Sequence, residues 1–155
     1  MAKLIKGHIV FEQDGYAFDF RFLKPITVIN GKSAIGKTLF WNKFKEYCAV
    51  NALTDFVFIN HKTSKSEIER LFSLENKIFI IDNADLVISA GLDPLVGMQV
   101  RNRFEIDETN QYVFIGRLIS HYTVDLLSVA TVVQTKPKHF RLWCSDAVGK
   151  VLDYE

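Results

Sequence analysis

The sequence predicts an α/β fold with a mainly parallel central sheet, and three observations lead to this prediction. Short runs of β-branched and aromatic residues alternate with helical patterns through the middle of the chain, which is typical of parallel sheets. The run Ile78–Ile81 contains no polar residue, as expected for a strand that is covered on both faces. A pair of strand-like runs lies near each end of the chain, so antiparallel hairpins should be added to the sheet.

The first half of the chain carries patterns for four strands and two helices. Alternating aromatic and polar residues predict a strand over 16–23. It follows a strand over 4–11, and Asp14-Gly15 between them is a strong hairpin signal. The β-branched run 26–29 is typical of a buried strand, and apolar residues three and four apart predict a helix over 37–50. A strand over 55–59 and a helix over 64–72, opened by a Ser64–Glu67 capping pattern, complete this half.

The second half continues the alternation and ends in a hairpin. The predicted strand 77–82 is followed by Asp93-Pro94, an N-cap and a first-turn proline that predict a helix to about residue 104. A buried strand is expected over 112–115. Strands over 129–135 and 139–144 should be joined by a turn at Lys136-Pro137-Lys138.

Composition indicates a single domain over 1–155, with a hairpin at 1–24, a core at 26–117 and added strands at 118–155. The 155 residues are 48% hydrophobic and 24% charged, which is ordinary for one globular core. A net charge of +1 gives no general reason to expect nucleic acid or an anionic membrane as partner. No apolar run approaches ~18 residues and the first residues lack a signal-peptide pattern, so the cytoplasm is the expected compartment. Cys48 and Cys144 are expected to be reduced and buried.

A glycine-containing loop between the predicted strand 26–29 and the predicted helix 37–50 matches the pattern GxxxxGKS/T at every fixed position. Its glycines permit tight backbone turns, so that successive N–H groups can surround phosphate oxygens beside the positive end of the helix. A lysine in this place can bind the β- and γ-phosphates, and a threonine hydroxyl suits Mg²⁺. The expected phosphate-binding residues are Gly31, Lys32, Ser33, Ala34, Ile35, Gly36, Lys37 and Thr38.

Asp82 is the second expected magnesium ligand. It comes directly after four apolar residues of a predicted strand, and ligands of open α/β sheets bind at the carboxyl ends of the strands. A carboxylate there can hold Mg²⁺ opposite Thr38, directly or through water. The sequence therefore predicts ATP and Mg²⁺ as cofactors, with Thr38 and Asp82 as the metal ligands.

These two motifs resemble the Walker A and Walker B motifs of P-loop NTPases, and the similar region runs over about 26–117. The strand over 112–115 suggests the added-strand branch, which includes AAA+, ABC, RecA-like and STAND ATPases. The resemblance implies a three-layer α/β P-loop fold and an ATPase activity. It also implies that Arg117, which follows the added strand, senses the γ-phosphate as a catalytic residue together with Lys37.

The sequence departs from this family at the position after Asp82. Many members have Glu there to orient the attacking water, whereas this chain has Asn83, which cannot accept a proton. Asp85 lies nearby and is the substitute catalytic base that we expect. The chain also has no LSGGQ-like signature, and the residues after Arg117 leave little room for the helical lid of an AAA+ protein.

Three functions are compatible with these motifs. The leading one is a MgATP-binding ATPase with slow or partner-stimulated hydrolysis. The others are an ATP-dependent switch or assembly module with little hydrolysis, and a small-molecule kinase. Adenine is the expected base because Asn76-Lys77 is not completed to the NKxD pattern for guanine. A neighbouring copy or a protein partner could supply an arginine to the site. Arg101 and Arg103 are candidates for such an arginine given to a neighbouring copy, although a solvated helix face is the favoured interpretation of both. The four histidines show no metal-ligand spacing.

Overall fold

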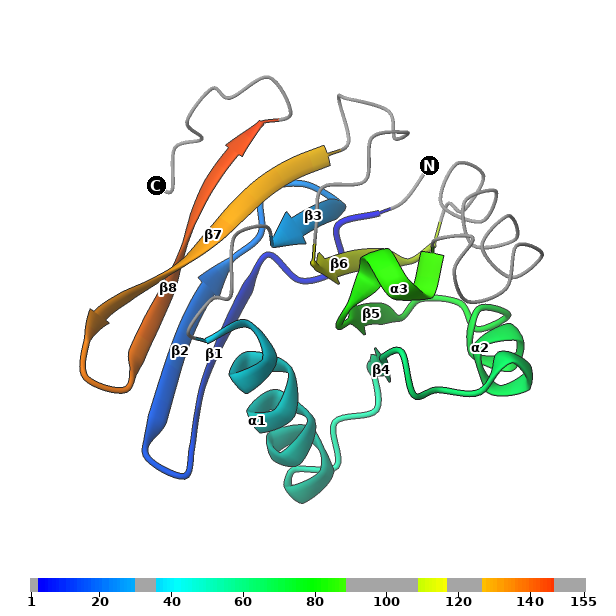
Figure 1. Ribbon diagram of the computed structural model, residues 1–155, viewed down its shortest axis with the longest axis horizontal. Coiled ribbons are helices and arrows are strands. Elements are labelled where there is room, and N and C mark those ends of the chain that lie inside the picture. The colour runs from blue at the N-terminus through cyan, green and yellow to red at the C-terminus, as the bar shows by residue number, and fades with distance from the viewer. Residues whose placement is uncertain (1–2, 30–35, 89–108, 117–126, 147–155) are drawn as a thin grey trace.

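The structure is a computed structural model that describes residues 3–29, 36–88, 109–116 and 127–146 (Figure 1). All of its strands belong to one sheet, and helices flank that sheet on both faces. The strands are β1 (His8–Gln13), β2 (Tyr16–Arg21), β3 (Ile26–Ile29), β4 (Phe56–Ile59), β5 (Ile78–Ile81), β6 (Gln111–Ile115), β7 (Leu127–Lys136) and β8 (His139–Asp146). The helices are α1 (Lys37–Val50), α2 (Lys65–Leu71) and the short α3 (Ala84–Ile88).

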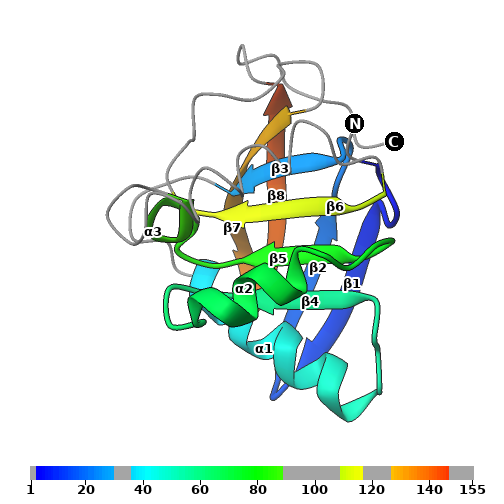
Figure 2. The same ribbon diagram turned by 90° about the vertical axis from the view of Figure 1, so that its right-hand side faces the viewer.

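The sheet has eight strands in the order β1-β2-β8-β7-β3-β6-β5-β4. The pairs β1–β2 and β7–β8 are antiparallel, and the remaining neighbours run parallel. The sheet does not stay open and flat: it curls into a half-barrel (Figures 1 and 2). Strands of ten and eight residues, β7 and β8, form part of the curl, because right-handed twist accumulates along long strands.

The predicted three-layer α/β P-loop fold with a mainly parallel central sheet is therefore wrong. The described part of the chain is mostly β, with strands of mixed direction and few helices. The sequence suggested that the two hairpins were additions to a core, but parallel pairing of β2 with β8 joins them within one continuous sheet. Their aromatic residues explain this, because side chains such as Phe18 and Phe20 are buried in the core around α1.

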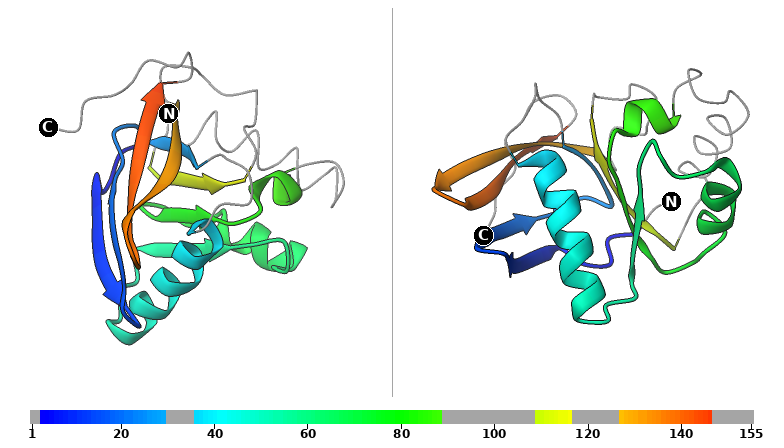
Figure 3. Two further views of the ribbon diagram at one scale, coloured as in Figure 1. Left: turned by 60° about the vertical axis from the view of Figure 1, so that its left-hand side comes forward. Right: turned by 60° about the horizontal axis from the view of Figure 1, so that its bottom comes forward.

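The core is divided between the two faces of the sheet. On one face, residues of β3, β4, β5 and β6 pack with Ile68 of α2 and Val87 of α3. On the other face, α1 inserts Phe40 and Phe44 among residues from both hairpins and from β5 and β6 (Figure 3). Apolar residues of β5 contribute to both clusters, which agrees with the predicted strand covered on both sides. In the described part of the chain, no helix is both long and apolar enough to cross a membrane.

Most elements have the bounds that the sequence predicts to within a few residues. The predicted strand 26–29 and helix 37–50 coincide with β3 and α1. Asp14 and Gly15 form the β1–β2 turn with φ of 53° and 82°, as a two-residue hairpin turn requires. Lys138 has a φ of 63° in the predicted turn between β7 and β8. The predicted helix 93–104 lies outside the described residues.

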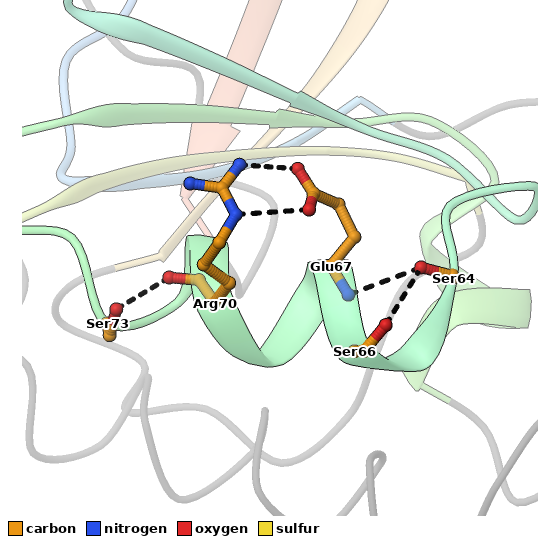
Figure 4. A network of polar contacts seen from close by, with 5 residues as sticks. All are labelled: Ser64, Ser66, Glu67, Arg70 and Ser73. Carbon is orange, nitrogen blue, oxygen red and sulfur yellow. Dashed lines mark hydrogen bonds and ion pairs between the residues drawn. The ribbon is translucent and has the colours of Figure 1, made fainter.

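The predicted capping pattern at α2 is confirmed in one of its two parts (Figure 4). Ser64 is the N-cap, and its Oγ accepts a hydrogen bond of 3.3 Å from the backbone N–H of Glu67. The Glu67 carboxylate does not return to Ser64 but accepts two hydrogen bonds from Arg70. Ser73 then donates to the carbonyl of Arg70 at 2.6 Å, just after the helix ends.

Candidate phosphate-binding site

The predicted phosphate loop lies between β3, which ends at Ile29, and α1, which begins at Lys37. Of its residues, the structure describes Gly36, Lys37 and Thr38, whereas Gly31, Lys32, Ser33, Ala34 and Ile35 lie outside the described part. The connection thus has the predicted context, a buried strand before it and a long helix after it. That helix has no acidic residue in its first turn and no side-chain cap, so no carboxylate of its own competes there for an anion.

Gly36 sits in a position that only glycine tolerates easily. Its φ of 103° is in the left-handed region, which residues with a Cβ avoid. A Cβ at this position would also lie 2.9 Å from Cγ1 of Val132 and 3.0 Å from Cδ1 of Phe140. Gly36, the last residue of the loop, therefore packs closely against β7 and β8. The second glycine of the motif has a packing role as well as a conformational one.

The orientation of α1 is fixed by hydrogen bonds and buried aromatic residues. The carbonyl of Gly36 accepts the first helical hydrogen bond from the N–H of Phe40 at 2.8 Å. One turn along, the indole Nε1 of Trp41 donates to the carbonyl of Ile80 in β5 at 3.0 Å. Trp41 is buried, so this bond ties α1 to the strand that precedes Asp82. Sequence reasoning assigned Trp41 no role at the site.

Asp82 lies beside the start of α1. Its backbone N–H donates to the carbonyl of Ile59 at 2.9 Å, and only 4% of the residue is exposed. The backbone of Asn83 and the side chain of Thr38 lie near its carboxylate. Burial raises the pKa of the Asp82 carboxyl above its usual value, while the nearby Asn83 backbone, Thr38 side chain, His61 and Lys37 act in the opposite direction.

The two expected magnesium ligands therefore lie close together. A hydroxyl and a carboxylate oxygen are hard donors of the kind that Mg²⁺ prefers. The described residues contain no group of three or more His, Cys, Asp or Glu that could hold a metal by themselves. The pair fits a cation that takes one or two ligands from the protein and the others from phosphate and water, and it does not fit a site built by protein alone.

Asn83 forms a second contact at this edge of the sheet. It has a φ of 50°, which asparagine tolerates better than most residues, and its Nδ2 lies 3.0 Å from Nδ1 of His61. The side-chain amide of Asn83 is the donor, so Nδ1 of His61 must be unprotonated in order to accept the bond. Sequence reasoning gave His61 no role. The available signal was that His61 and Asn83 each come two residues after strands that prove to be neighbours, β4 and β5.

The structure does not describe the other predicted site residues. Arg117, Arg101 and Arg103 lie outside the described residues. Asp85 belongs to α3, and the placement of its side chain is also outside the described part of the chain. Cys48 and Cys144, by contrast, are free thiols and buried as predicted.

Comparisons of the chain with protein-family models, with curated proteins and with solved structures find no match. A functional interpretation therefore rests on the motifs of the sequence and on the arrangement of Lys37, Thr38, Asp82 and their neighbours.

Proposed function

We propose that the chain binds MgATP at the loop between β3 and α1 and hydrolyses it slowly, or only when a partner stimulates the reaction. The observation that carries the proposal is that the Thr38 side chain lies close enough to the Asp82 carboxylate to lower its pKa. These residues come from separate segments of the chain, and the sequence pattern around each predicts a magnesium ligand. Lys37 is close enough to act on the charge of Asp82, as expected for a cation that binds the β- and γ-phosphates.

In this proposal each residue has a limited role. Backbone N–H groups of residues 31–36 surround the phosphates, and Lys37 neutralises charge on them. Thr38 and Asp82 hold Mg²⁺, which when bound supplies charge neutralisation at the β- and γ-phosphates. Arg117 adds a second cation for the γ-phosphate. ATP is the expected nucleotide, and the cytoplasm is the expected location.

Slow turnover follows from the position next to Asp82. Asn83 can hold a water molecule but cannot take its proton, and its amide nitrogen is engaged with His61. This contact also favours the second candidate function, a switch or assembly module that binds MgATP and hydrolyses little. The two candidates differ only in the rate of the chemical step, so that both predict the same binding site.

Calorimetric titration with ATP in the presence and absence of Mg²⁺ tests the shared part of the proposal. We expect saturable binding that needs Mg²⁺, and a Kd at least about tenfold higher in Lys37→Ala, since a charge-assisted contact contributes at least about 1.5 kcal/mol. Lys43→Ala is the matched control, because Lys43 is in the same helix but its Nζ is bonded to Asp14 in the β1–β2 turn. A wild-type protein that binds no MgATP would contradict the proposal.

Phosphate release separates the candidate functions. A slow ATPase releases phosphate at a rate that disappears in Lys37→Ala and falls sharply in Asp85→Ala. A switch binds MgATP with almost no release and changes its mass or its partner binding with the nucleotide. If ATP is consumed only when an acceptor is added, the protein is a kinase. Unchanged release by Asp85→Ala would show that Asp85 is not the base.

A further inference from the structure

The face of β1, β2, β8 and β7 that points away from α1 is exposed and partly apolar. Alternate residues of these strands, among them Phe18 and Phe140, are buried around α1, so the residues between them point to the other side. We call this side the outer face and define it by Val10, Glu12, Asp19, Val133, Arg141 and Trp143. Val10, Val133 and Trp143 are 60%, 41% and 56% exposed. Exposed apolar groups that gather on one face commonly mark an interaction site.

Two shallow hollows open on the outer face and adjoin each other. One has a volume of about 360 Å³ and the other about 240 Å³, and Thr135 and Arg141 line both. Val10 and Asp19 line the first, while Val133 and Trp143 line the second. The two hollows therefore extend across all four strands. The outer face is thus broad enough to bind another protein surface.

The strand register arranges the outer face in rows with a regular order of charge. In one row Val10 pairs with Asp19, Asp19 with Arg141, and Arg141 with Val133. From β1 to β7 that row is apolar, acidic, basic and apolar. The next row begins with Glu12 on β1 and ends with Lys136 on β7, through Ala17 and His139. In these two rows the acidic groups lie on β1 and β2 and the basic groups on β8 and β7, while the third row carries His8 on β1 and Arg21 on β2.

The order of charge in the first two rows makes this part of the outer face complementary to itself. A two-fold axis that runs along the strands, between β2 and β8, brings β1 of one copy over β7 of another. Asp19 then faces Arg141 of the second copy, and Val10 faces Val133 of the second copy. In the neighbouring row Glu12 meets Lys136 of the second copy. An in-plane axis across the strands through the first row would instead set Asp19 on Asp19 and Arg141 on Arg141, and such like-charge contacts are unfavourable.

We propose that the outer face binds a second copy of this chain about the two-fold axis along the strands. Each contact then occurs twice, as in any isologous interface. Stacked sheets cross at about 30°, so the pairs nearest the axis, Asp19 with Arg141, should contribute most to specificity. Trp143 and the two valines supply the apolar part of the interface.

The charged groups on the outer face remain accessible in one copy. The imidazole of His8 contacts the Asp19 carboxylate, yet the Asp19 side chain is still 43% exposed. No ion pair described in residues 3–29, 36–88, 109–116 and 127–146 engages Arg141, although it is the cross-strand neighbour of Asp19. Both members of the central pair can therefore turn toward a second copy.

Charge reversal tests the proposal, with mass measured by sedimentation at increasing protein concentration. We expect the wild type to dimerise, and Asp19→Arg and Arg141→Asp each to weaken the dimer at least tenfold in Kd, about the loss of one exposed pair counted twice. An equimolar mixture of the two variants should dimerise again, because both central contacts regain opposite charges. Glu69→Arg, an equal charge change on α2, should leave the dimer unaffected.

The double variant Asp19→Arg/Arg141→Asp is the control for a single variant that fails to fold. It carries both charge reversals, so each central pair again has opposite charges, and it should dimerise like the wild type. Trp143→Ala should also weaken the dimer while its thermal unfolding stays close to that of the wild type. A wild type that stays monomeric up to about 1 mM overturns the proposal. So does a dimer that ignores charge reversal, or a mixture of the two variants that remains monomeric. None of these outcomes depends on MgATP.

Discussion

The side chain of Thr38 lies close enough to the carboxylate of Asp82 to lower its pKa, across the gap between the first turn of α1 and the end of β5. This proximity depends on how α1 packs. Trp41, one turn further along the helix, is bonded to the carbonyl of Ile80, two residues before Asp82. The packing of α1 on β5 therefore also sets the distance between the two proposed magnesium ligands. This coupling of packing to site geometry is the basis of the first prediction.

Asp82→Asn should stabilise the free protein while it abolishes Mg²⁺-dependent ATP binding. Burial raises the pKa of Asp82 in the folded state, so the ionised form is disfavoured by folding. Wild-type stability should therefore be lost as pH rises through the raised pKa, and asparagine escapes this loss.

The free energy of unfolding in urea should be higher for the variant at pH 7, with a difference that shrinks as pH falls toward 3.8, the ordinary value. Asp55→Asn, at an exposed position, is the control. Lower stability of Asp82→Asn at pH 7 would mean that the polar groups near the carboxylate outweigh its burial.

Asn83→Glu should increase ATP turnover without tightening ATP binding. A carboxylate there could accept the proton of the attacking water, and general-base catalysis typically contributes about 100-fold or more. Asn83 has a φ of 50°, so glutamate there should also cost the folded state about 1 kcal/mol, which lowers stability and leaves the gain in turnover unaffected. Asn83→Gln controls for size, and phosphate release at saturating MgATP is the measurement. No increase, in a variant that still binds MgATP, would place the catalytic base elsewhere.

Local sequence signals predicted the elements well and the fold class poorly, for one physical reason. The bounds of β3 and α1 are set by a β-branched run and by glycine, which act on their own neighbourhoods. The pairing of β2 with β8 joins segments from opposite ends of the chain, and no local pattern specifies it. Strands were therefore predicted individually, while their union into one curled sheet was not.

The candidate site divides in the same way. Thr38 and Asp82 could be predicted to lie near each other because Thr38 opens the helix that follows one strand and Asp82 follows another, and parallel strands end at the same edge of a sheet. The contact between His61 and Asn83 could not, because it requires β4 and β5 to be adjacent and in register. The sequence around each of these two residues indicates only an ordinary loop that follows a strand.

Cys48 should be almost inert in the folded protein. Burial raises the pKa of its thiol to about 11, and the thiolate is the reactive form. Iodoacetamide at pH 8 should therefore modify native Cys48 at least about 100-fold more slowly than the urea-unfolded chain, given an ordinary thiol pKa of about 8.5. Mass spectrometry of peptides separates its label from that of Cys144. Equal rates in the native and unfolded states would show that the end of α1 opens readily.

Gly36→Ala should destabilise the protein whether or not nucleotide is present. The φ of 103° costs alanine about 1 kcal/mol, and the new methyl would lie 2.9 Å from Val132 and 3.0 Å from Phe140. Overpacking of this kind typically costs about 1–3 kcal/mol, so a loss of roughly 2–4 kcal/mol is expected in urea unfolding. Placed in a Val132→Ala background, the same substitution should cost less, because the nearest overlap is gone. If Gly36→Ala keeps the wild-type stability but loses MgATP binding, Gly36 is needed only for the phosphates. If Gly36→Ala loses both stability and MgATP binding, and Val132→Ala restores only the stability, Gly36 is needed for packing and for the phosphates.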